Sequence, residues 1–202
     1  ETPMTFGSLD NVTFLATPFV TAALSNGQHS HTKAGGRGIV AVQLSPVISA
    51  TLTGSAAYAA FPLQPFRDGW QYELSLGSSW VVNPQTMLSA SLKAAFDATD
   101  DASRQTTELS ARLRVDHAMA SGLVLGGELT VGTRLHNAPP PLSNGANQQD
   151  QFASVRLEAS HRDIVIGPFM PQIYYEYATQ ASDNAFYRYD SHDIGLAMRA
   201  RL

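Results

Sequence analysis

The sequence has no cysteine, only two lysines and no long apolar run. The absence of cysteine excludes disulfide bonds and thiolate metal sites. Because no stretch of about 18 consecutive apolar residues occurs, a transmembrane helix is also excluded. The net charge is −4, from 13 basic and 17 acidic side chains, so no electrostatic attraction to nucleic acid is expected. The length of 202 residues allows one barrel, or one to two soluble domains.

The strongest pattern lies between residues 86 and 136, where apolar and polar side chains alternate along three successive runs. In the first run Leu88, Leu92 and Phe96 share one side. A period of two predicts β-strand and not helix. The opposite side carries full charges, such as Arg112 and Glu128, and not only the Ser and Thr of a half-wet soluble sheet. This combination indicates lipid on one face of the sheet and a charged, watery lumen on the other.

The same alternation over the rest of the chain predicts ten strands. Longer polar connections are expected at one end of the strands, at residues 25–38, 63–69, 99–104, 137–149 and 181–187. Mostly shorter turns are expected at the other end, at residues 45–46, 83–85, 120–121 and 162–168. An even strand number with long loops on one side and short turns on the other is typical of bacterial outer-membrane barrels.

The predicted fold is therefore an all-β, antiparallel up-and-down transmembrane β-barrel of about ten strands. Residues 11–202 form the barrel and residues 1–10 a short lead-in. We expect an integral outer-membrane location, with outer-membrane lipid around the barrel and a signal peptide removed before Glu1. An unpaired strand edge in hydrocarbon costs several kcal/mol per orphan group, so the sheet must close. Whether ten strands close on themselves or need more from elsewhere is left open.

The inward positions of these strands carry both signs of charge in roughly equal numbers. We therefore expect interlocked ion pairs and a plugged interior, and not a strongly ion-selective pore. The predicted lumen network consists of Glu73, Lys93, Glu108, Arg112, Arg114, Glu128, Arg134, Arg156, Glu158, Glu176, Arg199 and Arg201. Trp70 and Trp80 lie on the lipid side of one strand, roughly 25 Å apart, which is the spacing of two aromatic girdles. The alternative is that both are core tryptophans of a soluble sandwich.

The last fifty or so residues resemble the C-terminal barrel of the surface lipoprotein assembly modifier family. The similarity lies in residues 167–177 (GPFMPQIYYEY), 182–184 (SDN), 187–190 (YRYD) and 194–196 (IGL). The resemblance implies a non-catalytic barrel in protein export or surface display, with an exported lipoprotein or a secreted protein as partner. This sequence lacks the family's periplasmic helical repeats, has fewer strands than the family's barrel and ends in Leu202. It is therefore expected to be a fragment or a reduced relative.

Three other functions are considered. One is a structural or accessory barrel with partner subunits, and another is a small-solute pore. The third is a rim enzyme, because Asp100-Asp101 and Asp190-x-His192 resemble the acidic pair and the Asp-x-His pair of omptin proteases. Solvated rim residues are the favoured interpretation of these groups, so no catalytic residue is expected. His29-x-His31 lacks a visible third ligand, and neither a metal nor a cofactor is expected.

Overall fold

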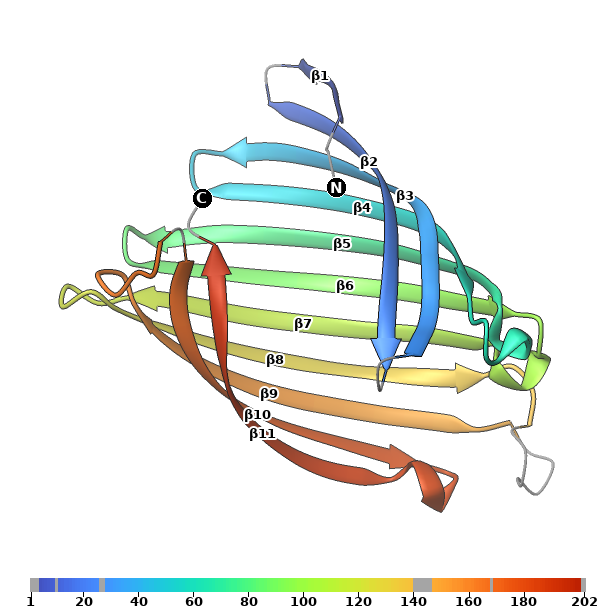
Figure 1. Cartoon of the computed structure of the whole chain (residues 1–202). Helices are drawn as coiled ribbons and strands as arrows, with labels where there is room; N and C mark the ends of the chain where they lie inside the picture. Colours follow the sequence, from blue (N-terminus) through green and yellow to red (C-terminus); the bar gives the residue numbers. More distant parts are fainter. Residues whose placement is uncertain (1–3, 10, 26–27, 140–146, 168, 201–202) are drawn as a thin grey trace.

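The computed structural model describes residues 4–9, 11–25, 28–139, 147–167 and 169–200. These residues form eleven antiparallel strands that follow one another in a single sheet in chain order (Figure 1). The first strand is short and the other ten are long. The strands are β1 (Met4–Leu9), β2 (Val12–Ser25), β3 (Gln28–Ser45), β4 (Ile48–Ala60), β5 (Gly69–Asn83), β6 (Thr86–Thr99), β7 (Thr106–Ala118), β8 (Leu123–His136), β9 (Gln149–His161), β10 (Phe169–Ser182) and β11 (Tyr189–Ala200). The predicted all-β, up-and-down class is confirmed.

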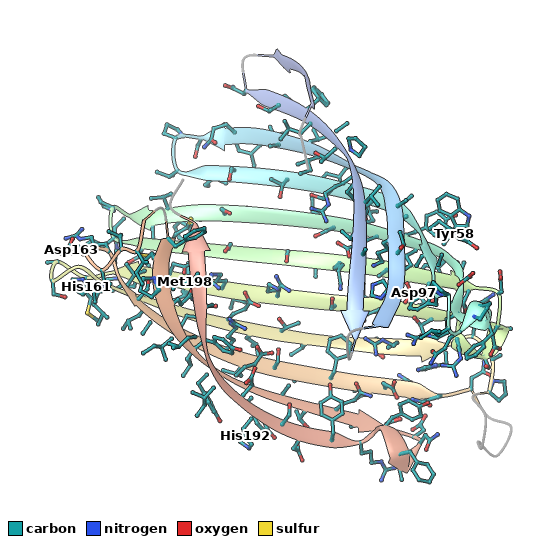
Figure 2. All side chains as sticks on the ribbon, in the orientation of Figure 1. Tyr58, Asp97, His161, Asp163, His192 and Met198 are labelled. Atoms are coloured by element: carbon teal, nitrogen blue, oxygen red, sulfur yellow. The ribbon has the colours of Figure 1, made fainter. Side chains whose placement is uncertain are left out.

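The connections divide as the sequence indicates. Three short 3-10 helices, η1 (Pro65–Arg67), η2 (Ala102–Arg104) and η3 (Ala185–Tyr187), lie in connections at one end of the sheet, called the loop end below. The opposite end, called the turn end, carries the hairpin after Ala118 and the turn at Asp163. Figure 2 shows Asp97 near the loop end and His161 at the turn end.

Two predicted segments differ from the structure. The lead-in contains β1, whose residues pair with β2 from Leu9↔Val12 to Met4↔Ala16. The predicted loop at residues 25–38 is wrong, because β3 begins at Gln28 and pairs with both β2 and β4. Its outward side chains there are small, as at Gly36 and Gly38, so the sequence shows no apolar alternation. The backbone ladder, which does not depend on side-chain type, forms all the same.

The outward face carries the apolar side chains and the sheet has almost no conventional core. Leu92, Leu113 and Leu129 are 57%, 53% and 43% exposed. Among the described residues, the only apolar side chains that are buried are Ala57 and Ala59. A soluble sandwich of this size would shield many large side chains between two layers. The exposed outer face is instead the arrangement expected of a sheet whose outer solvent is lipid.

The sheet is curled like a barrel wall but is not closed. Its edges are β1 and β11, and β11 pairs only with β10 among the described strands. In Figure 1, β2 and β3 curve over one side of the sheet, and β10 and β11 curve over the same side from the opposite edge. Closure, which the cost of bare edges in lipid predicts, is therefore not achieved by these strands alone.

Two glycines allow aromatic rings to lie flat against the inner wall. A Cβ on Gly132 would collide with the ring of Phe152, its register partner on β9. A Cβ on Gly195 would lie 2.6 Å from the hydroxyl of Tyr174, its register partner on β10. Placing an aromatic side chain over a glycine of the next strand fixes register and supports curvature. Tyr174 in turn contributes to the ion-paired inner face.

Candidate functional site: an ion-paired inner face

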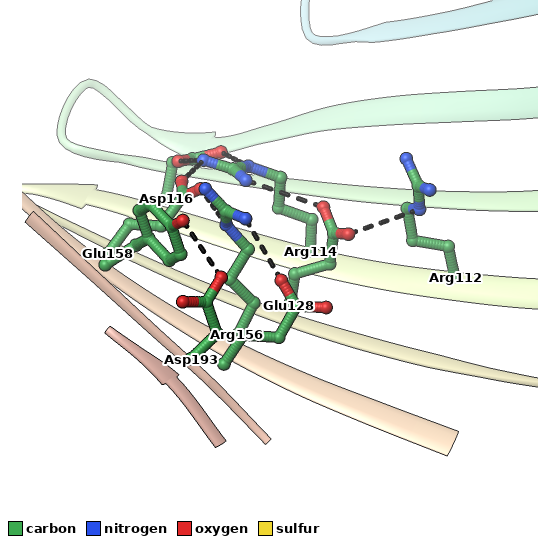
Figure 3. A network of polar contacts seen from close by, with 9 residues as sticks. Arg112, Arg114, Asp116, Glu128, Arg156, Glu158 and Asp193 are labelled. Carbon is green, nitrogen blue, oxygen red and sulfur yellow. Dashed lines mark hydrogen bonds and ion pairs between the residues drawn. The ribbon is translucent and has the colours of Figure 1, made fainter. Parts of the chain in front are cut away.

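The register of β7 to β11 places charges opposite one another in a single row across the inner wall. Arg114 pairs with Glu128, Glu128 with Arg156, Arg156 with Glu176, and Glu176 with Asp193. Directly opposed residues in antiparallel strands have their Cβ atoms about 5 Å apart, so opposite charges there attract. The charges of this row alternate from Arg114 to Glu176, and the row ends on a second carboxylate, Asp193; part of it is drawn in Figure 3.

Arg114 is the centre of this row. Its guanidinium donates to both oxygens of Asp116, at 2.8 and 2.7 Å, and to Glu158 at 2.6 Å. A longer contact of 3.5 Å reaches Glu128, which also pairs with Arg112 at 3.3 Å. The side chains of Arg114 and Glu158 are 21% and 10% exposed, so these bonds lie largely out of water. Bidentate arginine–carboxylate pairs are the stronger and more directional kind.

Arg156 extends the row towards the edge strand. It donates to Glu158 at 2.7 Å and to Glu176 at 3.0 Å, joining β9 to β10. Its guanidinium also lies 3.9 Å from the ring centre of Tyr174, a cation–π contact. The Tyr174 hydroxyl donates to Asp193 on β11 at 3.0 Å. Hydrogen bonds and charge therefore link β7 to β11 without a break.

A second cluster lies nearer the loop end. Glu108 on β7 accepts from Lys93 on β6 at 2.9 Å and from Arg134 on β8 at 2.7 Å. These groups border an inner hollow of about 680 Å³, which Glu73, Lys33 and others also line. The hollow is polar and open, and ion pairs occupy one of its walls.

Not every residue of the predicted network joins it. Glu73 lines the hollow but forms no ion pair with any described residue. The side chain of Arg199 and the whole of Arg201 lie outside the described residues. Two carboxylates, Asp116 and Asp193, belong to the row but were not predicted to, although their positions in the polar alternation of β7 and β11 carry the signal.

The two inward cations of β3 were also missed. Lys33 and Arg37 line the hollow, and the cause of the omission is the incorrect loop at residues 25–38. A buried group at the loop end was missed as well. Asp150 is 1% exposed and accepts from Gln148 at 2.7 Å, and His136 lies 3.3 Å from it.

Two of the rim residues considered for catalysis, Asp101 and Asp190, accept hydrogen bonds from neighbouring side chains. Asp101 accepts hydrogen bonds from the Ser103 hydroxyl at 2.8 Å and amide at 3.0 Å, which lower the pKa of Asp101. Asp190 and His192 lie on the outer face of β11, where Asp190 accepts from the hydroxyl of Tyr177. The side chain of His29 lies outside the described residues. Within the described part of the chain, no group of three or more His, Asp or Glu is placed to hold a metal ion.

Trp70 and Trp80 both point outward from β5 and are 47% and 48% exposed. Trp70 belongs to an aromatic group towards the loop end, with ring centres 5.7 Å from Tyr58 and 6.1 Å from Tyr72. Trp80 lies opposite Ile48 near the turn end. The two tryptophans thus lie near opposite ends of one strand, and neither is enclosed.

The sheet thus has ten long strands, an apolar outer face and an inner wall of cross-strand ion pairs. Comparison with known proteins was made for the same chain. The family profile described as surface lipoprotein assembly modifier matches residues 9–201. The chain belongs to the surface lipoprotein assembly modifier family. The match covers nearly the whole sheet, and not only the C-terminal motifs noted in the sequence. No curated protein and no solved structure matches the chain. None of its described helices is both long and apolar enough to cross a membrane.

Proposed function

We propose that this chain is a wall of an outer-membrane β-barrel that helps lipoproteins reach the cell surface, without making or breaking bonds itself. The family match over residues 9–201 is the observation that carries the proposal. Surface lipoprotein assembly requires a polar path past lipid, and a two-faced sheet supplies one. The partners are outer-membrane lipid and an exported lipoprotein or secreted protein.

The membrane location is supported by the contrast between the two faces. Large apolar side chains are exposed outside while charged groups pair inside. In water this arrangement would be unfavourable, because the exposed apolar surface would forgo the roughly 25 cal/mol per Å² that its burial contributes. In a bilayer the same outer face is solvated by lipid and the inner face by water and by its own counter-charges.

A non-catalytic role is supported by the state of the charged groups. Arg114, Arg156, Glu108 and Glu158 are each held by two or more partners that fix their positions. Groups engaged in this way stiffen a wall, because their hydrogen bonds hold them in fixed positions. A second candidate, an accessory subunit of a larger outer-membrane complex, is favoured by the open sheet, since a bare strand edge invites a partner.

The location can be tested by fluorescence in vesicles that contain brominated lipids. Trp70→Phe and Trp80→Phe variants each retain one outward tryptophan, and we expect bromine on the acyl chains to quench both. The control places one tryptophan inward, by Thr53→Trp in a chain that lacks the other two, and should be quenched little. Equal quenching of the inward and outward probes would contradict a lipid-facing outer surface.

The export role can be tested in cells. Deletion of the gene should remove a lipoprotein from the cell surface, as measured by protease access to whole cells. The total cellular amount of that lipoprotein should stay unchanged. Display that persists after deletion would remove the export role and leave the accessory one. Steady current in a planar bilayer would instead support a small-solute pore.

A further inference from the structure

Buried polar atoms without a partner gather at one level of the inner face, near the loop end. Among the described residues, the buried side-chain atoms that lack a hydrogen bond are Gln71 Oε1, His136 Nδ1 and Gln148 Oε1. In the register of β5 to β8, one inward row runs from Gln71 through Asp97 and Thr106 to His136. The backbone amide of His136 then donates to Gln148. Because buried polar groups are nearly always hydrogen-bonded, exceptions in a single row point to a ligand.

These atoms need a ligand that can both donate and accept hydrogen bonds. The amide oxygens of Gln71 and Gln148 accept, whereas Nδ1 of His136 accepts or donates according to the protonation of the ring. The other ring nitrogen of His136 lies 3.3 Å from Asp150, which fixes the orientation of the imidazole. Gln71 and His136 both line the inner hollow of about 680 Å³, so this hollow is the place where a ligand would meet them.

The charges of the hollow that have no counter-charge cancel one another. Lys33 and Arg37 line it from β3, and Glu73 and Asp97 line it from β5 and β6. None of these four side chains forms an ion pair with any described residue. An anion attracted by the two cations would be repelled by the two carboxylates, and a cation would meet the reverse. A neutral ligand is therefore favoured.

The hollow also has room and an apolar wall. Ser55 lies between Arg37 and Glu73 in the register, and Ala95 follows Glu73, so small side chains separate the charged ones. The volume falls within the roughly 300–1,000 Å³ of small-molecule sites. Phe19 of β2 lines the same hollow and offers the flat apolar surface of its ring. The C–H face of a sugar ring can pack against such a surface.

We propose that the inner hollow binds a neutral oligosaccharide. Gln71 and Asp97 accept from its hydroxyl groups, Lys33 and Arg37 donate to them, and His136 bonds to a further hydroxyl. Since a hydroxyl group is donor and acceptor at once, one class of ligand satisfies all of these groups. Soluble sugars and the glycans of membrane lipids share this chemistry, and the experiment tells the two sources apart. The proposal goes beyond the proposed function and does not depend on the export of lipoproteins.

The test measures how a ligand protects a thiol of the purified protein in detergent from a maleimide. The sequence has no cysteine, so Ala95→Cys places one in the hollow, and the control Ser91→Cys places one on the same face of β6 but outside the hollow. The probes are maltotriose, lactose and sucrose as soluble sugars, and lipopolysaccharide as a membrane-anchored glycan. At about ten times its dissociation constant, a bound probe should slow labelling of Ala95→Cys about tenfold and leave Ser91→Cys unaffected.

Further variants locate the contacts, with binding measured by calorimetry. Gln71→Ala and Asp97→Asn should each weaken binding about fivefold, because each loses or weakens one hydrogen bond to the ligand. The matched control is Gln151→Ala on the outer face of β9, which should bind as the unaltered protein does. Because Gln71 Oε1 has no partner in the free protein, Gln71→Ala should not lower the free energy of unfolding in urea. A loss of stability equal to the loss of binding would assign Gln71 a structural role and contradict the proposal.

Two charged probes separate a sugar site from an ion site. Inorganic phosphate and trialanine should protect Ala95→Cys less than the sugars do, and sugar binding should be the same at low and high salt. Stronger protection by phosphate or trialanine would overturn the proposal, as would the absence of protection by every sugar and by lipopolysaccharide. Protection by lipopolysaccharide alone would support the same chemistry from a membrane-anchored source. If Ala95→Cys in folded protein is not labelled even without a probe, the hollow is already filled and the proposal is wrong.

Discussion

Replacing Arg114 by methionine should destabilise the sheet more than any other single change in the inner row. The expected loss in the free energy of unfolding follows from the three carboxylates that contact Arg114. Glu158 keeps its bond to Arg156 at 2.7 Å, and Glu128 keeps Arg112 at 3.3 Å. No other cation among the described residues contacts Asp116, which loses both of its bonds to Arg114. Since charge-assisted hydrogen bonds contribute about 1.5–3 kcal/mol and the site is mostly shielded, we expect a loss of about 2–3 kcal/mol.

The control is Arg112→Met on the same strand. The side chain of Arg112 is 57% exposed, and among the described residues its one ion pair is with Glu128. Exposed pairs of this kind contribute about 0–1 kcal/mol, so this variant should be nearly neutral. Urea unfolding in detergent, followed by the fluorescence of the two tryptophans, measures both variants. If Arg114→Met costs no more than Arg112→Met, the inner row is not a stabilising network and the reasoning fails.

Two further changes test other parts of the wall by the same urea assay. Gly132→Ala should cost about 1–3 kcal/mol, because its Cβ would meet the Phe152 ring and lie 2.8 Å from a backbone oxygen; Gly38→Ala, with open space outside, should be nearly neutral, and equal costs would contradict the packing described. Glu108→Gln should cost about 1–2 kcal/mol, because Lys93 and Arg134 would lose their shared counter-charge. That cost should fall at high salt, which screens repulsion between the two cations, and a salt-independent cost would contradict it.

Where apolar and charged residues alternate strictly, the sequence was enough to predict the faces of the strands. Leu92 and Leu113 lie outside, while Glu108 and Arg134 lie inside, because a strand turns successive side chains to opposite faces whatever its neighbours do. Balanced charge on the inner positions was enough to predict ion pairs. It was not enough to predict which groups pair, because that depends on register between strands.

Register and edges are properties of the whole sheet, and this explains what the sequence did not predict. The link from Asp193 through Tyr174 to Arg156 depends on a ring resting over Gly195, which no single strand reveals. The first part of β3, residues 28–38, was predicted as loop because glycine and alanine on its outer side give no hydrophobic signal, whereas the strand at residues 39–44 was predicted. Whether the sheet closes depends on the number of strands and on the curvature of the sheet. The alternation of apolar and polar residues determines neither of them.

The distribution of ion pairs also divides the wall into a stiff part and a loose part. From β6 to β10 each pair of neighbouring strands is joined by a contact between side chains of opposite sign, which for β8 and β9 is the 3.3 Å contact of His136 with Asp150. Arg114 also bridges from β7 past β8 to Glu158 on β9. Among the described residues, no ion pair joins β2, β3, β4 or β5 to a neighbour, and small residues such as Gly35 and Gly38 line part of this region.

Opening of the wall by local separation of strands should therefore begin at the β2 side. Hydrogen exchange in detergent should show amides of β2 and β3 exchanging faster than those of β8, although both lie in regular ladders. The Arg114→Met variant should raise exchange in β7 and β8 towards that of β3. If instead β8 exchanges as fast as β3 in the unaltered chain, the ion pairs do not hold the wall together, and its stiffness depends on the backbone ladder alone.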